Sequence, residues 1–140
     1  MTADVRSAIS DQPLDVRAHE QFVARPAGGA TVVFCGVVRD HDAERSVVAL
    51  EYEAHPTAAA VLADVAAQFA TAPELLAVTV SHRIGRLEVG DVALVAAVAA
   101  PHRREAFDAC AQLVDQVKHR LPVWKRQVFA DGSDEWVNCP

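Results

Sequence analysis

Apolar residues recur along the chain with two different spacings, and these spacings predict its helices and strands. After Pro56, apolar side chains return every three or four residues as far as Pro73, which predicts a helix with one buried face. A second stripe of this kind predicts a helix from Pro101 to about Arg120. The proline that opens each stripe suits the first turn of a helix, where its missing N–H is not needed.

Shorter apolar runs predict strands. Val92 to Ala100 is apolar at every position, which is typical of a central strand covered on both faces. Gly36 interrupts another run and predicts a bulge or a close approach of two backbones. Strands are predicted at 14–18 (with a short helix then running to Ala24), 30–38, 47–54, 76–82 and 123–130, with 131–132 turning into a further segment at 135–137. Residues 1–13 are polar and are expected to be flexible, and 39–45 is expected to be a charged loop.

The order strand–strand–helix occurs twice, over 30–71 and 76–120. This order predicts an α+β fold, with two main helices packed on an antiparallel or mixed sheet. The 140 residues contain no low-complexity linker, so we expect a single domain over 1–140. We also expect a cytoplasmic protein, because no apolar stretch is long enough to span a bilayer and the N-terminus lacks the apolar core of a signal peptide.

The net charge of −6 argues against general affinity for nucleic acid. The charge is uneven, because Pro101 to Gln127 carries six basic and three acidic side chains. A basic pocket on an acidic body suits a small anionic ligand. Cys35, Cys110 and Cys139 are too far apart to suggest a disulfide framework or a zinc site, and the first two are expected to be buried thiols. The histidines show no metal-ligand spacing, so neither a metal nor a cofactor is expected.

The chain has eleven arginines but only two lysines, Lys118 and Lys125. A lysine amine can lose its proton when it is partly desolvated, which an arginine cannot do. Lys118 falls at the edge of the apolar stripe of the second helix, where desolvation lowers the pKa of an amine and suits it to acid/base or nucleophilic work. The sequence is equally compatible with a lysine that lays its stem over the core and holds its charge near the helix C-terminus.

Two basic residues, His102 and Arg103, open the second helix directly after Pro101. Ala100 has no side chain that could cap the free amides there, so these amides and the two side chains could bind a phosphate or carboxylate. A solvated basic turn is an equally common outcome. Arg39 and His82-Arg83, each at the end of a predicted strand, are ambiguous when taken alone.

Several segments in order carry a more specific signal than any of these features alone. They are Gly29-Ala30, Phe34 to Arg39, Leu50 to Ala54, His82 to Gly85, Leu87, Val89-Gly90, His102-Arg103, Ala106-Phe107, Ala109, Lys118, Pro122 and Trp124-Lys125. Together they resemble the large, catalytic subunit of molybdopterin synthase, over nearly all of residues 28–137.

This resemblance implies an α/β-hammerhead fold and a sulfurtransferase of molybdenum cofactor biosynthesis. It implies a homodimer flanked by two copies of a small ubiquitin-like sulfur carrier, which makes a heterotetramer. The thiocarboxylate of the carrier's C-terminal Gly-Gly tail would give its sulfur to cyclic pyranopterin monophosphate in two rounds, producing the dithiolene of molybdopterin. It implies neither a nucleic-acid partner nor a membrane.

The resemblance also implies roles for individual residues. Lys118 matches the family's essential lysine, as an acid/base or a transient covalent partner, and Lys125 matches its second active-site lysine. Phe34 and Arg39 would line the channel for the carrier tail. The implied substrate-binding residues are Val37, Val38, Arg39, His102, Arg103, Lys118, Lys125, Arg126 and Gln127. Gln127 stands where the family usually has glutamate.

Two alternatives to an enzyme remain open from the sequence. One is a non-catalytic module on the same fold, which would bind the carrier tail or a phosphorylated metabolite. The other is an anion-binding α+β domain unrelated to this pathway. Product formation separates the enzyme from both, and carrier binding separates the two alternatives from each other.

Overall fold

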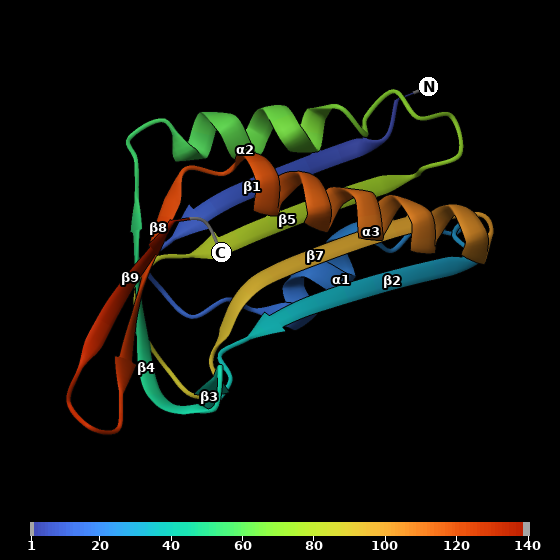
Figure 1. The fold of residues 1–140 in the computed structure, drawn as a ribbon. Coiled ribbons are helices and arrows are strands. Elements are labelled where there is room, and N and C mark those ends of the chain that lie inside the picture. Colours follow the sequence, from blue (N-terminus) through green and yellow to red (C-terminus); the bar gives the residue numbers. More distant parts are fainter. Residues whose placement is uncertain (1, 139–140) are drawn as a thin grey trace.

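The computed structural model describes residues 2–138, so Cys139 lies outside the described residues. Three helices and two sheets make up this part of the chain (Figure 1). The helices are α1 (Val16–Val23), α2 (Ala58–Ala67) and α3 (Arg103–Arg120). The strands are β1 (Asp4–Ser10), β2 (Ala30–Val37), β3 (His41–Asp42), β4 (Arg45–Ala54), β5 (Ala77–Arg83), β6 (Gly85–Glu88), β7 (Val92–Ala100), β8 (Val123–Phe129) and β9 (Asp134–Asn138).

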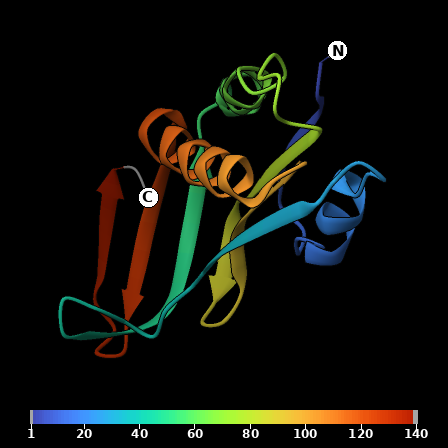
Figure 2. The same cartoon turned by 90° about the vertical axis from the view of Figure 1, so that its right-hand side faces the viewer.

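The first sheet has the strand order β1-β5-β7-β2. β1 runs parallel to β5, whereas β7 is antiparallel to both of its neighbours. Helices α2 and α3 lie on one face of this sheet and α1 on the other (Figures 1 and 2). Residues 93–100 of β7 are buried, which confirms the predicted central strand, and the mixed sheet with helices against it confirms the predicted α+β fold.

The strands of the first sheet divide their side chains between two cores. In β5, Val78 and Val80 face the core under α2 and α3, whereas Ala77 belongs to a smaller core with Val23 of α1. This division follows from the alternation of side chains along a strand. Each fully buried valine or leucine side chain contributes roughly 1.5–3 kcal/mol to stability. The same alternation sends Ser81 toward α1, where it contacts His19, and His82 toward α3.

The second sheet has the order β3-β4-β8-β9, and β6 also pairs with β4. Its strands stand across the end of the first sheet rather than continuing it (Figure 1). In the β4–β8 ladder, Tyr52 is opposite Lys125 and Leu50 is opposite Gln127. Directly opposed residues share one face of a sheet, so these four side chains lie together on the face that meets the first sheet.

The N-terminal segment differs from the prediction. Residues 4–10, expected to be flexible, form β1 and pair with β5, because Val5 and Ile9 pack against the core under α2. The predicted strand at 14–18 is also wrong. The carboxylate of Asp15 accepts a hydrogen bond of 3.0 Å from the backbone N–H of Ala18, and this cap starts α1 at Val16.

The segment around β2 and β3 contains a bulge, a tight contact and a hairpin. The β2–β7 register shifts between Gly36 and Val37, which confirms the predicted bulge. Gly29 is needed where it stands, because a Cβ there would lie 2.3 Å from the carbonyl oxygen of Pro101. The expected loop 39–45 contains β3, which pairs with β4.

The two described cysteines have different environments. Cys110 is buried, as predicted, and burial raises the pKa of its thiol to about 11. Cys35 is exposed, contrary to the prediction, because it alternates with the side chains of β2 that pack on the core. Within the described residues, none of the helices is both long enough and apolar enough to cross a membrane.

Candidate functional site

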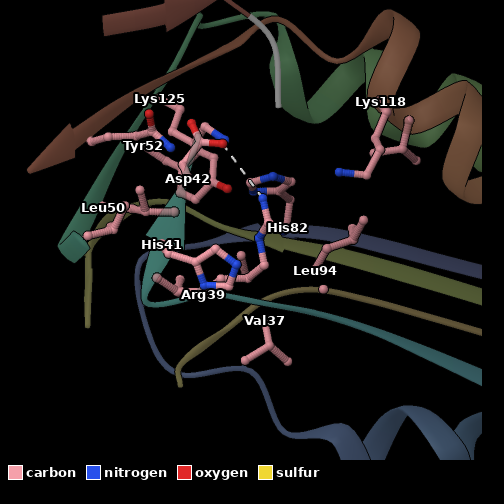
Figure 3. Close-up of a pocket in the computed structure, with 16 residues that line it drawn as sticks. Val37, Arg39, His41, Asp42, Leu50, Tyr52, His82, Leu94, Lys118 and Lys125 are labelled. Atoms are coloured by element: carbon pink, nitrogen blue, oxygen red, sulfur yellow. Dashed lines mark ion pairs between the residues drawn. The ribbon is translucent and has the colours of Figure 1, made fainter. Parts of the chain in front are cut away.

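A pocket of about 240 Å³ opens where the two sheets and the end of α3 meet (Figure 3). It takes its lining from the ends of β2, β5 and α3, the start of β7, and β3, β4 and β8. The lining residues are Gly36, Val37, Val38, Arg39, His41, Asp42, Val47, Leu50, Tyr52, His82, Ala93, Leu94, Val117, Lys118, Lys125 and Gln127. Segments that are far apart in the sequence therefore converge on this one site.

The pocket has a buried floor, which we define as Leu50, Tyr52, His82 and Gln127. The rings of Tyr52 and His82 pack edge to face, with their centroids 4.9 Å apart and their planes at 83°. Burial raises the pKa of Tyr52 to about 12, so its phenol is protonated at neutral pH. Tyr52 and Gln127 thus give the floor polar but uncharged groups.

His82 is the most deeply buried titratable group of the floor, with 2% of its surface exposed. Burial lowers the pKa of His82 to about 4. The hydrogen bond with the backbone of Arg83 opposes this shift, and the positive charge of Lys118 adds to it. The imidazole is therefore neutral at neutral pH.

The pocket also has an exposed rim, which we define as Arg39, His41 and Lys118. The sequence predicts a partly desolvated Lys118, but in the chain alone this residue is exposed, although its neighbour Val117 is buried. Desolvation of this amine therefore requires that something cover the pocket. Lys125, on β8, is half-buried at the edge of the floor.

Arg39 has a side chain that is 67% exposed, and its guanidinium lies 3.7 Å from the carboxylate of Asp42 (Figure 3). Exposed ion pairs of this kind contribute at most about 1 kcal/mol, because water screens them and the side chains lose freedom. Arg39 can therefore turn from Asp42 to an anion in the pocket at little cost.

Two predicted residues lie far from this pocket in the same chain. His102 is the N-cap of α3 and Arg103 its first residue, whereas Lys118 is near the other end of the helix. With a rise of 1.5 Å per residue, the 16 positions between His102 and Lys118 span roughly 24 Å. Both residues are exposed, and one copy of the chain does not bring them to the lysines.

Arg126 and Phe34 also lie outside the pocket lining. Arg126 is between Lys125 and Gln127 on β8, so alternation points it to the opposite face, where it contacts Glu51 at 3.5 Å and Asp134 at 3.0 Å. Phe34 lines a separate apolar groove between β2 and α3 with Val32, Val33, Phe107, Cys110, Ala111, Val114 and Asp115. The other predicted residues, Val37, Val38, Arg39, Lys118, Lys125 and Gln127, all line the pocket.

Sequence reasoning missed most of the floor. A signal was present, because His82 continues the alternation of Val78 and Val80 on the face covered by α2 and α3. Tyr52 and Leu50 likewise share one face of β4. That these two faces meet follows from the way the second sheet packs on the first, which no local pattern encodes.

Three cationic side chains, Arg39, Lys118 and Lys125, thus surround an uncharged floor. This arrangement attracts an anion and holds two amines beside it. An amine can exchange protons with a bound group or attack an acyl carbon. The pocket can therefore support acid/base chemistry or acyl transfer involving anionic reactants.

Comparison with known proteins gives concordant results. The family model described as MoaE protein matches residues 9–120. The chain is 41% identical over 133 residues to the molybdopterin synthase catalytic subunit of Nostoc sp., covering 94% of this chain and 81% of that protein. It is 39% identical over 130 residues to molybdopterin synthase catalytic subunit 1 of Mycobacterium tuberculosis, covering 92% and 88%.

Solved structures agree with these sequence matches. The structure of molybdopterin synthase from Staphylococcus aureus superposes with a TM-score of 0.84 at 31% identity, covering 92% of this chain and 94% of that one. A complex of subunits 1 and 2 of molybdopterin-converting factor from Helicobacter pylori shares the fold, with a TM-score of 0.72 at 19% identity, covering 94% and 88%. The family match extends from the end of β1 to the end of α3, and the chain therefore belongs to the MoaE family.

Proposed function

We propose that this chain is the catalytic subunit of molybdopterin synthase. It would transfer sulfur from the thiocarboxylated C-terminus of a small carrier protein to cyclic pyranopterin monophosphate, in the cytoplasm. In each transfer one sulfur replaces an oxygen substituent on the pterin, and the carrier's acyl carbon takes up one oxygen, from that substituent or from water, to become a carboxylate. The sulfur stays at the sulfide level, so no net oxidation or reduction is needed. The observation that carries this proposal is the convergence of Lys118, Lys125 and Arg39 on one pocket in a member of the MoaE family.

In this proposal Lys118 is the main catalytic residue. As an acid/base it would move protons at the exchanging sulfur and oxygen atoms, and as a nucleophile it would hold the acyl group transiently. Lys125 would provide the second cation, beside the neutral amide of Gln127, which is 4% exposed. Arg39 and the exposed Val37 would contact the anionic pterin at the mouth of the pocket, and the buried Val38 would contact it from inside the pocket.

The carrier tail needs an extended, apolar path to the pocket. We propose that it follows the groove between β2 and α3, which Phe34 lines. This groove adjoins the pocket at Gly36, since a Cβ built on Gly36 would lie 3.5 Å from the ring of Phe34. A tail lying there would also cover Lys118 and remove water from its amine, which the free chain does not do.

The position of His102 and Arg103 requires a second copy of the chain if they are to bind the same substrate. Roughly 24 Å of helix separates them from Lys118 within one copy. We therefore propose that, in a homodimer flanked by two carriers, the start of α3 of one copy lies beside the pocket of the other. The exposed turn with its free amides would then hold the substrate phosphate.

Reconstitution tests the proposed function. The purified chain, supplied with thiocarboxylated carrier and cyclic pyranopterin monophosphate, should form molybdopterin, read as its fluorescent oxidised derivative. The matched control is the same carrier ending in an ordinary carboxylate, which should give no product. Tight carrier binding without product would contradict a catalytic role and indicate a binding module.

Mixing two inactive variants tests the arrangement of the dimer. Lys118→Ala and the double variant His102→Ala/Arg103→Ala should each have low activity alone. If the two sites lie on different copies, each mixed dimer contains one intact pocket. Random pairing after the two variants are refolded together should then restore roughly a quarter of the original turnover. No restoration would contradict a pocket shared between two copies.

A further inference from the structure

One buried polar group of the pocket has no part in the proposed chemistry so far, namely the imidazole of His82. It lies on β5 between Ile9 of β1 and Leu94 of β7, which are both uncharged. The preceding residue, Ser81, points to the opposite face of the sheet, and its hydroxyl lies 2.7 Å from the ring of His19. A histidine on an apolar strand is costly to bury unless its ring nitrogens are used.

The hydrogen bond of Nδ1 fixes which nitrogen of His82 carries the proton. Nδ1 lies 2.7 Å from the backbone oxygen of Arg83. A carbonyl oxygen can only accept, so Nδ1 must donate its N–H. Because the ring is neutral, Nε2 then carries the lone pair and is an acceptor.

The ring is also held in orientation. The ring of Tyr52 packs against the imidazole in an edge-to-face arrangement, with the two centroids 4.9 Å apart. Tyr52 is itself buried in the floor of the pocket. With one nitrogen bonded to the backbone and the ring packed against Tyr52, the imidazole has little freedom to rotate. Its acceptor therefore has a fixed direction.

Lys118 is the cation that can donate a hydrogen bond to this acceptor. Both residues line the pocket, and the side chain of Lys118 points from α3 toward the His82 ring (Figure 3). The charge of Lys118 is one of the causes that lower the pKa of His82, so the two groups are within electrostatic reach. The other titratable or charged groups lining the pocket are Arg39, His41, Asp42, Tyr52 and Lys125.

We propose that His82 is a positioning residue for Lys118. Its Nε2 accepts a hydrogen bond from the Lys118 amine, both in the free chain and in the working pocket, and so directs this amine toward the reacting atoms. An exposed lysine has many rotamers, and an acceptor fixed in the pocket floor selects one of them. This inference rests on the proposed function, which supplies the reaction that Lys118 serves.

Two substitutions separate this role from a purely structural one. In His82→Asn, the amide nitrogen takes the place of Nδ1 and keeps the bond to Arg83, but nothing replaces Nε2. In His82→Gln, the amide group reaches the place of Nε2 and can accept, but the bond to Arg83 is lost. Ser81→Ala is the matched control, since it alters the same strand on the face away from the pocket.

Positioning predicts a specific order of activities in the reconstituted assay. His82→Asn should lower kcat on the order of 10²-fold, as misplacement of a catalytic group does, and should change KM less. Its pH–activity profile should differ from that of the unsubstituted chain. His82→Gln should retain most of the turnover and the original profile, and Ser81→Ala should match the unsubstituted chain. The reverse order, or equal losses in both His82 variants, would overturn the inference.

A second measurement does not depend on turnover. An acetylating reagent labels exposed amines, and peptide mass spectrometry gives the rate at each lysine. Loss of Nε2 should increase the labelling rate of Lys118 relative to Lys125 by on the order of tenfold in His82→Asn, the equivalent of one charge-assisted hydrogen bond. An unchanged ratio would overturn the inference. If the unsubstituted chain makes no product, the proposed function fails, and this ratio still decides whether His82 directs Lys118.

Discussion

The floor and the rim of the pocket differ in burial, in charge and in how firmly they are held. The floor residues Tyr52 and His82 are buried, uncharged and packed against each other. The rim residues Arg39 and Lys118 are charged and exposed. The difference indicates a division of labour, in which the floor fixes the shape of the site before any ligand arrives and the rim adapts to the ligand.

The largest expected effect comes from the rim. Lys118→Ala should lower turnover on the order of 10²- to 10⁴-fold, because it removes the group that exchanges protons or holds the acyl intermediate. Since Lys118 is exposed, the free energy of unfolding should change by no more than about 0.5 kcal/mol. The reconstituted assay and urea denaturation measure the two quantities. A large loss of stability would show that Lys118, like the floor residues, contributes to the stability of the fold.

The next effect comes from the floor and concerns stability at low pH. The pKa of His82 is about 4 in the folded chain and 6.5 in the unfolded chain, so the unfolded state binds a proton more readily. Stability from this group is therefore complete above pH 6.5 and is lost as the pH falls through 4, by about 3 kcal/mol. His82→Asn cannot titrate, so its free energy of unfolding should fall less between pH 7 and pH 4.

Urea denaturation at several pH values measures that difference, and Ser81→Ala serves as the control with the original pH dependence. Equal slopes for His82→Asn and the unsubstituted chain between pH 7 and pH 4 would show that His82 is not the buried neutral group of the floor.

The smallest effect concerns the hairpin that carries Asp42 to the pocket. Ala43 and Glu44 have positive φ angles of 47° and 68°, which residues other than glycine and asparagine rarely adopt. The double substitution Ala43→Asn/Glu44→Gly should relieve this strain and stabilise the chain by about 1 kcal/mol, because an asparagine–glycine pair favours such a turn. The thermal midpoint should rise by roughly 4 °C. A fall would show that the hairpin is not strained.

The elements that the sequence predicts are those whose pattern is local. β7 is predictable because every position is apolar, and α3 because its stripe is long and regular. β1 is missed because its alternation is interrupted by polar residues, and its partner β5 is about seventy residues away. The start of α1 is mistaken for a strand when the Asp15 cap is not recognised.

The residues of the candidate site likewise divide into those that a local pattern can single out and those that depend on tertiary packing. Lys118 and Lys125 stand out because lysine is rare in this chain, and Arg39 because it ends a strand of a recognised motif. His82 and Tyr52 escape assignment to the site, because their roles depend on two sheet faces that meet only in the folded chain. His102 and Arg103 lie at the start of α3 and Lys118 lies near its end, so the length of the helix keeps them out of the same pocket within one copy of the chain.

The most direct test of catalysis by the Lys118 amine is the turnover of Lys118→Arg, with Lys125→Arg measured beside it. Arginine keeps the positive charge and a long stem at this exposed position but cannot exchange its proton near neutral pH. If the amine does the chemistry, Lys118→Arg should lose on the order of 10²-fold or more in turnover while its thermal midpoint and carrier binding are unchanged. Full activity in Lys118→Arg would contradict this claim and reduce Lys118 to a source of positive charge.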